Sequence, residues 1–326
     1  MQRPLPRPFR TPPASWIREC FLSIPRNPAT SSRHAFFGYT QALGCVSLNP
    51  SKRRGCLMAR QRKFHFGFLL LLLLALILAA TGGFAVQYYF SASDIEAETD
   101  FVDGPADQYE YIFTRLSHNY PNLHTWQGHT WDTDYPKADR QFLQGVLRWT
   151  NIQARRQEQV LRPLSPQLFG FPFLYAVEVG YWHLSEEEAV RLRDYLLRGG
   201  FLVVDDFHGT REWKNFEDQI RKVFPDRPIQ EVELSDPIFH CFFDMEQKIQ
   251  VPGLQFLYSG RLYEQDGFTP HYRAIYDDDN RIMVMINFNV DLGDAWEWSD
   301  FPQYPEFYTS YAYRLGVNYV VYAMTH

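Results

Sequence analysis

The sequence predicts an α/β domain in which helices cover both faces of a mostly parallel sheet. The stretch Leu192–Trp213 carries the strongest evidence, because it combines a helix end, a Gly199-Gly200 turn, an apolar strand and two carboxylates. Phe201–Val204 is apolar at four successive positions, as in strands that are buried on both faces of a parallel sheet. Other apolar strands alternate with helical patterns along the chain, which is the arrangement expected of this fold class.

The strands and helices of the first half follow from local patterns. The predicted elements are a strand over 109–116, a loop over 118–135, a helix over 139–151 and a strand over 173–179. Ser185 and Glu188 then have the spacing of a capping box, so a further helix begins there. Gly199 can adopt the left-handed conformation that ends this helix.

The second half continues the alternation. The predicted elements are a helix over 210–224, a strand over 229–234, strands over 272–276 and 281–288, and a helix over 306–322. Pro225 stops the first of these helices. Asp277–Asn280 separates two apolar runs and is expected to form the solvated tip of a hairpin.

Charge divides the 326-residue chain into two parts. Residues 1–90 hold 12 Lys and Arg and one acidic residue, which gives a net charge of +11. The remaining 20 basic and 37 acidic residues give −17. Nucleic-acid binding needs clustered Lys and Arg, so the acidic part argues against nucleic acid as a partner.

An apolar segment, Phe64–Val86, explains why the N-terminal part of the chain is basic, because positive charges commonly precede a membrane segment. Its 23 residues are apolar or glycine at all but two positions, which is long enough for an uncleaved transmembrane anchor. Basic residues just before it are expected to stay cytoplasmic, so residues from Ser91 onward should lie outside the cytoplasm. The alternative is a cleaved signal peptide, for which Gly83-Phe84-Ala85 offers a small-x-small site.

Composition sets the remaining boundaries. Residues 1–57 are rich in Pro, Arg and Ser without periodicity, so we interpret them as a disordered or mis-assigned extension and Met58 as the true start. Residues 91–107 form a polar linker, and residues 108–326 form a single α/β domain. Of four cysteines only Cys241 lies in that domain, so we expect no intramolecular disulfide there and interpret Cys241 as a buried, inert thiol.

Five motifs, in order, resemble the domain of unknown function 4159 family. They are Trp131–Asp139, Gly199–Phe207, Phe224–Arg227, Asp236–His240 and Arg314–Ala323. The resemblance covers roughly residues 109–326 and implies a bacterial, membrane-associated protein with a three-layer sandwich that is glutamine amidotransferase-like or flavodoxin-like. It also implies envelope partners with von Willebrand factor A domains or associated MoxR-type ATPases, and it implies no established activity.

The chain departs from the amidotransferases at one decisive position. Those enzymes place a nucleophilic Cys after a strand, whereas Val203–Gly209 contains none. Thiol chemistry needs a thiolate, so we expect no glutaminase activity and favour a protein that is not an enzyme.

Carboxylates and a histidine occupy that strand end instead. Asp205 and Asp206 point to opposite faces while the strand continues, so they converge only if the chain turns there. We expect one of them to cap the next helix, through Thr210 or nearby amides, and the other to sit by a helix N-terminus. His208 is expected to be a solvated loop residue. The alternative is a catalytic or metal-binding group made of Asp205, Asp206 and His208, with Asp236 nearby.

Other polar residues are weaker candidates. Six could bind a ligand: Trp131, Asp134, Asp236, His240, Arg314 and Asn318. Three histidines in the aromatic loop match no zinc spacing: His118, His124 and His129. A further acidic series is interpreted as a turn and helix cap rather than a calcium site: Asp291, Asp294 and Glu297. We therefore predict no cofactor and assign no metal site.

Taken together, these features favour a non-catalytic binding module. We expect a membrane-anchored, extracytoplasmic domain that recognises a protein partner in the cell envelope. Two alternatives stay open, a metal-assisted hydrolase or carbohydrate-acting enzyme and a sensor of a small ligand. In each case the ligand is expected at the carboxyl ends of the strands, where open α/β sheets bind ligands.

Overall fold

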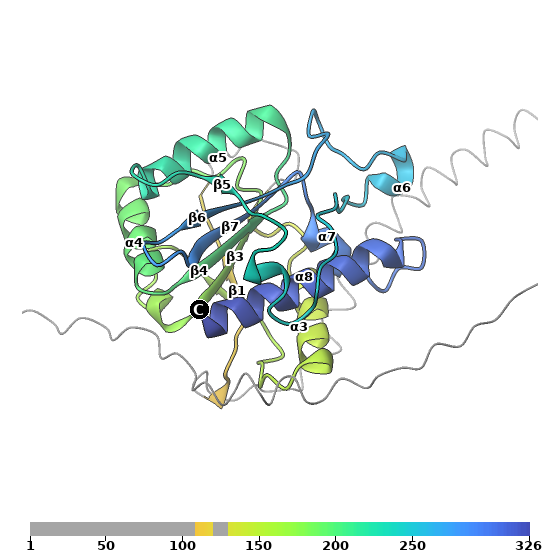
Figure 1. The fold of residues 1–326 in the computed structure, drawn as a ribbon, viewed down its shortest axis with the longest axis horizontal. Coiled ribbons are helices and arrows are strands. Elements are labelled where there is room, and N and C mark those ends of the chain that lie inside the picture. The colour runs from red at the N-terminus through yellow and green to blue at the C-terminus, as the bar shows by residue number, and fades with distance from the viewer. Residues whose placement is uncertain (1–107, 120–129) are drawn as a thin grey trace, which may run out of the picture. The chain divides into compact units, whose positions relative to one another are not determined.

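A seven-stranded mixed sheet organises the domain in the computed structural model, which describes residues 108–119 and 130–326 (Figure 1). The strands are β1 (Thr114–Leu116), β2 (Gln159–Leu161), β3 (Phe173–Val177), β4 (Phe201–Asp205), β5 (Gln230–Glu231), β6 (His271–Tyr276) and β7 (Ile282–Phe288). Their order in the sheet is β2-β1-β3-β4-β7-β6-β5. The pairings from β2 to β7 are parallel, and the β7–β6 and β6–β5 pairings are antiparallel.

Helices pack on both faces of this sheet (Figure 1). They are α3 (Lys137–Trp149), α4 (Glu186–Leu197), α5 (Gly209–Val223), α6 (Phe256–Ser259), α7 (Leu292–Glu297), α8 (Glu306–Thr325) and the 3-10 helices η2 (Leu168–Gly170) and η3 (Pro237–Phe239). Helices α4 and α5 share a core with Leu202 and Val204 of β4. Helices α3 and α8 share another with Phe201 and Val203. Strand β4 is therefore buried on both faces, as its sequence predicts.

Local signals define the best-predicted elements. Ser185 accepts a hydrogen bond from the Glu188 amide, and the Glu188 side chain accepts one from the Ser185 amide, so the predicted capping box is confirmed. Gly199 follows α4 with a φ of 105°, where an L side chain would be strained. The hairpin of β6 and β7 and the long C-terminal helix are also confirmed.

The edges of the sheet differ from the predictions. The predicted strand over 109–116 narrows to β1, because Tyr111 makes only an isolated bridge with Ala154. The predicted strand over 229–234 narrows to the two residues of β5, which pair with β6. The short elements β2, α6 and α7 were not predicted, since three to six residues are too few to show a period.

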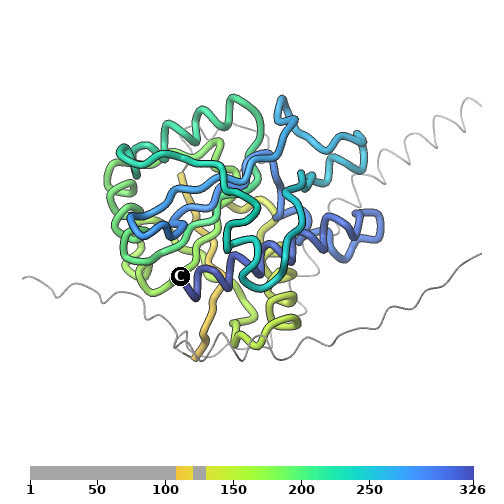
Figure 2. The backbone as a smooth tube through the Cα atoms, in the orientation of Figure 1, coloured from red at the N-terminus to blue at the C-terminus, as the bar shows by residue number. Residues whose placement is uncertain are grey.

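A long connection joins β5 to β6, leaving the sheet at Glu231 and returning at His271 (Figure 2). Its second half lies over the carboxyl ends of the strands. Gln250 donates to the Asn289 carbonyl over 3.2 Å, and Thr210 at the start of α5 donates its amide to Asp266 over 2.8 Å. This connection therefore covers the carboxyl ends of the parallel strands, where a ligand is expected.

Several predictions lie outside the described residues. These are the extension over 1–57, the apolar segment Phe64–Val86 and the linker over 91–107. No helix in residues 108–119 and 130–326 is both long and apolar enough to cross a membrane.

Candidate functional site

The first residue after each of three neighbouring parallel strands adopts a left-handed backbone. Glu178 follows β3 with a φ of 55°, Asp206 follows β4 with 51°, and Asn289 follows β7 with 61°. Non-glycine residues seldom adopt this conformation, and such residues cluster at functional sites. The Glu178 amide donates to the Asp206 carbonyl over 3.1 Å, so pairing continues past the strands. The chain thus turns at Asp206, and this is the turn that Asp205 and Asp206 would need to approach one ligand.

Both carboxylate oxygens of Asp205 accept hydrogen bonds from other groups of the protein. Its carboxylate accepts from the Tyr175 hydroxyl at 2.7 Å, Asn287 Nδ2 at 3.1 Å, and the amides of Leu292 at 2.9 Å and Gly293 at 3.2 Å. Burial raises the pKa of Asp205 to about 7, although these donors favour its charged form. Asp205 therefore lies at the N-terminus of α7, which confirms the prediction that one of the two aspartates sits by a helix N-terminus. The prediction that the other caps the helix after β4 is wrong, because the N-cap residue of α5 is neither aspartate and its side chain makes no capping hydrogen bond.

Asp206 instead belongs to a buried group of carboxylates. Oxygen atoms of Asp134, Asp206 and Asp291 all lie within 4.8 Å of one another. Asp134, Asp294 and Glu297 form a second group within the same limit. The Oδ2 atom of Asp134 is buried and has no hydrogen-bond partner in the described part of the chain. An acceptor in that state lacks the donor or cation that a buried carboxylate needs.

Arg115 fixes the loop that carries Asp134. Its Nε donates to Asp139 at 3.1 and 3.0 Å, and both side chains are completely buried. Its Nη1 donates to the carbonyls of Trp131 at 3.2 Å and Thr133 at 2.9 Å. Both carbonyls lie just before Asp134 in the chain, and Asp134 itself has a φ of 61°. A buried charge on β1 therefore positions a carboxylate that is distant in the sequence.

Two glycines leave room for the carboxylates. A Cβ at Gly293 would lie 2.5 Å from Asp134 Oδ2. A Cβ at Gly253 would lie 2.7 Å from Asp291 Oδ2 and 2.9 Å from Asp294 Oδ2. Real Cβ atoms do not approach other atoms so closely, so only glycine permits this packing of acidic oxygens.

Burial and mutual repulsion disfavour the ionised form of the group. Burial raises the pKa of Asp206 to about 7, and the nearby Glu178 carboxylate contributes to that rise. Burial likewise raises the pKa of Asp134 and of Asp291, with further upward contributions from the neighbouring carboxylates. A bound cation would reverse this repulsion, because it favours the charged form of every oxygen that it contacts.

His208 supports Asp206 from the start of α5. It is buried, and its Nε2 lies 3.2 Å from Asp206 Oδ1. Burial lowers the pKa of His208, but the hydrogen bond to Asp206 and nearby carboxylates outweigh it and raise that pKa to about 9. The prediction of a solvated loop residue is wrong, because the connection between β5 and β6 covers this end of the sheet.

A family comparison identifies the domain. The family model described as Domain of unknown function (DUF4159) matches residues 113–324. The chain belongs to the DUF4159 family. No curated protein is similar enough to the chain to count as a match.

Four predicted ligand residues of the DUF4159 domain lie apart from the carboxylate group, around η3 and α8: Asp236, His240, Arg314 and Asn318. Asp236 caps η3 through the Ile238 amide and lies 3.4 Å from the Tyr276 hydroxyl. Tyr276 ends β6 and pairs with the start of β7. Asp236 therefore lies at the opposite end of the strands from the carboxyl ends of the parallel strands. The prediction that Asp236 joins Asp205 and His208 is therefore wrong.

Two smaller predictions concern buried sulfur and imidazole groups. Cys241 is a free thiol that donates to the Asn318 carbonyl over 3.2 Å, and burial raises its pKa to about 12, in keeping with an inert thiol. His118 Nε2 donates to the Val177 carbonyl over 2.9 Å. His124 and His129 lie outside the described residues.

Asp291, Asp294 and Glu297 were interpreted as a turn and helix cap, and the cap is confirmed at Asp291. Asp291 accepts from the Asp294 amide over 2.8 Å and caps α7. The same cap turns Asp291 toward Asp134 and Asp206. The spacing of three residues was the available signal, but a cap and a metal ligand share it.

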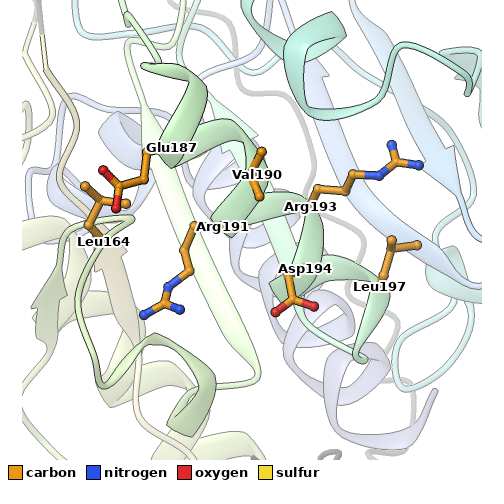
Figure 3. Close-up of a pocket in the computed structure, with 7 residues that line it drawn as sticks. All are labelled: Leu164, Glu187, Val190, Arg191, Arg193, Asp194 and Leu197. Atoms are coloured by element: carbon orange, nitrogen blue, oxygen red, sulfur yellow. The ribbon is translucent and has the colours of Figure 1, made fainter. Parts of the chain in front are cut away.

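A pocket on the surface of the DUF4159 domain lies elsewhere. It has a volume of about 510 Å³ and lies along the outer face of α4 (Figure 3). Two of its charged side chains already have partners, since Arg193 contacts Asp226 at 2.8 Å and Asp194 contacts Arg198 at 2.6 Å. We therefore place the functional site at the carboxylates and not in this groove.

Proposed function

We propose that the domain binds an oxygen-rich ligand through a divalent cation held by Asp134, Asp206 and Asp291. The observation that carries this proposal is the approach of their oxygen atoms to within 4.8 Å of one another. Hard cations such as Mg²⁺, Ca²⁺ and Mn²⁺ select oxygen ligands. They take six or more such ligands, so three carboxylates leave coordination positions for an outside ligand.

The alternative to a cation is a set of protonated carboxyl groups. Such groups donate hydrogen bonds, yet Asp134 Oδ2 is buried without a partner in the described residues. A cation satisfies this oxygen and offsets repulsion among the three carboxylates. The cation therefore accounts for both observations at once.

The setting of the domain is proposed from its sequence. Phe64–Val86 would anchor it in the membrane in a single pass, with residues 108–326 on the periplasmic side. Its ligand would be an acidic or carbonyl group of an envelope protein, such as a von Willebrand factor A-type or MoxR-associated protein. The order of its parallel strands and the helices on both faces support a glutamine amidotransferase-like sandwich, in which the strand end Val203–Gly209 would be the place of the nucleophile.

A second candidate function is a metal-assisted hydrolase. The contact between His208 and Asp206 favours it, because an imidazole beside a metal ligand can accept or donate a proton. Asp205 takes no part in this alternative, since protein donors occupy it.

Thermal unfolding of the full chain tests the proposal. The chain is purified in mild detergent because of Phe64–Val86, treated with EDTA, and unfolded with and without Ca²⁺ or Mn²⁺. A cation at one hundred times its dissociation constant stabilises by about 2.7 kcal/mol, which should raise Tm by roughly 5–10 °C.

Two substitutions make this test specific. Asp291→Asn should abolish the cation-dependent rise while keeping the cap of α7, because Asn caps helices as well as Asp does. Asp278→Asn is the matched control, since that side chain is 91% exposed at the hairpin tip, and it should keep the full rise. An unchanged Tm on addition of either cation to the parent chain would contradict the proposal.

A further inference from the structure

We infer that the site holds two cations bridged by Asp134, and that they bind an oxyanion such as phosphate or carboxylate between them. This inference rests on the proposed function and assigns its ligand class. One cation would lie among Asp134, Asp206 and Asp291, and the other among Asp134, Asp294 and Glu297.

Asp134 is the only residue shared by these two groups of described residues. A carboxylate has two oxygen atoms and can therefore contact two cations at once. In two-metal sites the ions lie about 3.5–4 Å apart. In each group, one oxygen atom per residue lies within 4.8 Å of the others, and Asp134 belongs to both groups. Two cations, one in each group, could therefore lie at a separation typical of two-metal sites.

One unpartnered atom within the carboxylate group points to a ligand here, and a buried imidazole lies beside the group. Asp134 Oδ2 is buried and lacks a partner among residues 108–119 and 130–326. His208 is 5% exposed, its Nε2 contacts Asp206 at 3.2 Å, and its buried Nδ1 also lacks a partner in those residues. Gly293 and Gly253 keep the adjoining space free, because a Cβ at either would collide with these carboxylates.

Charge favours two cations over one. The two groups contain five carboxylates, and His208 contacts one of them at Asp206. With a protonated His208, one divalent cation leaves two negative charges uncompensated and two cations leave none. Uncompensated buried charge is costly. Lys137 does not supply the missing charge, since it pairs with Asp300 at 3.1 Å.

The ligand class follows from the coordination. Each cation receives three carboxylates and needs about three more oxygens. Two neighbouring cations with open positions clamp an anion that offers two oxygens, as in the two-metal sites of phosphatases and nucleases. Phosphate and carboxylate groups share this geometry.

Manganese titration of the EDTA-treated full chain in detergent tests the inference. We expect two Mn²⁺ per chain and an electron paramagnetic resonance spectrum of an exchange-coupled pair. Glu297→Gln should halve the stoichiometry and restore the spectrum of isolated Mn²⁺, whereas Asp278→Asn should change neither. One uncoupled Mn²⁺ in the parent chain would overturn the bridge and leave the proposed function intact. No bound Mn²⁺ would overturn both.

Inorganic phosphate and acetate, added separately to the Mn²⁺-loaded chain, test the ligand class. A change in the coupled spectrum with either anion supports an oxyanion between the ions, and the anion that acts at lower concentration identifies the preferred group. Chloride at the same ionic strength is the control. A spectrum that is indifferent to both oxyanions would overturn this assignment.

Discussion

Replacement of Arg115 by Met is expected to lower the free energy of unfolding by about 3–5 kcal/mol. The substitution leaves Asp139 as a buried carboxylate without its cation, and both side chains are completely buried in the parent chain. It also removes the donors to the Trp131 and Thr133 carbonyls. Urea denaturation followed by tryptophan fluorescence measures the loss, because the slope with urea reports whether the unfolding transition itself has changed.

The double variant Arg115→Met/Asp139→Leu separates the effect of Arg115 on stability from its effect on the position of the loop that carries Asp134. Replacing both partners of a buried ion pair by apolar groups is often neutral, so most of the lost stability should return. Cation binding should not return, because the loop that carries Asp134 still lacks its anchor. A single variant that loses less than about 1 kcal/mol, or a double variant that binds cation as the parent does, would contradict this role of Arg115.

Asp205 and Asp206 are adjacent, and their conversion to Asn is expected to have opposite effects. Donors reach both oxygens of Asp205, with Tyr175 and the α7 amides at Oδ2 and Asn287 at Oδ1. Asp205→Asn leaves only one acceptor oxygen, so one set of buried donors meets an NH2 group and the substitution should cost about 3 kcal/mol or more. Asp206→Asn should stabilise the cation-free protein at pH 8, because it removes a buried charge.

The pH dependence of the Asp206→Asn effect has a definite sign. Burial raises the folded-state pKa of Asp206 to about 7, above its value of about 3.9 in unfolded chains. The folded protein therefore binds the extra proton, and the parent chain loses stability as pH rises from 4 to 7. The variant escapes this loss, which amounts to about 1.4 kcal/mol per unit of pKa shift.

Urea denaturation in EDTA at pH 4.5 and 8 measures this pair of effects. The advantage of Asp206→Asn should be small at pH 4.5 and large at pH 8, and saturating Mn²⁺ should reverse it by stabilising only the parent. A destabilising Asp206→Asn at pH 8 without cation, or a neutral Asp205→Asn, would contradict the division of roles.

Much of the fold was predictable because its signals are local. The capping box at Ser185, the turn at Gly199 and the apolar β4 each depend on residues within a few positions. The edge strands were not, since β2 and β5 contain only three and two residues. These short strands form because neighbouring strands pair with them, and their own sequences carry too little β-propensity to predict them.

The site was only partly predictable. The sequence singled out the strand end after β4, and Asp134 and Asp206 were among its candidate residues. The separation of roles between Asp205 and Asp206 depends on a left-handed turn at Asp206. The group itself joins Asp134 on a loop held by β1 to Asp291 after β7, and no local pattern relates such distant positions. Buried and exposed acidic residues look alike until tertiary packing is known.

The position of a bound cation tests the central claim most directly. Crystals of the full chain grown with Mn²⁺, measured at the manganese absorption edge, would locate the ion by its anomalous scattering. We expect density bounded by Asp134, Asp206 and Asp291, with metal–oxygen distances of about 2.0–2.6 Å. Anomalous density only elsewhere, or none in Mn²⁺-saturated crystals, would contradict the claim that these carboxylates form a cation site.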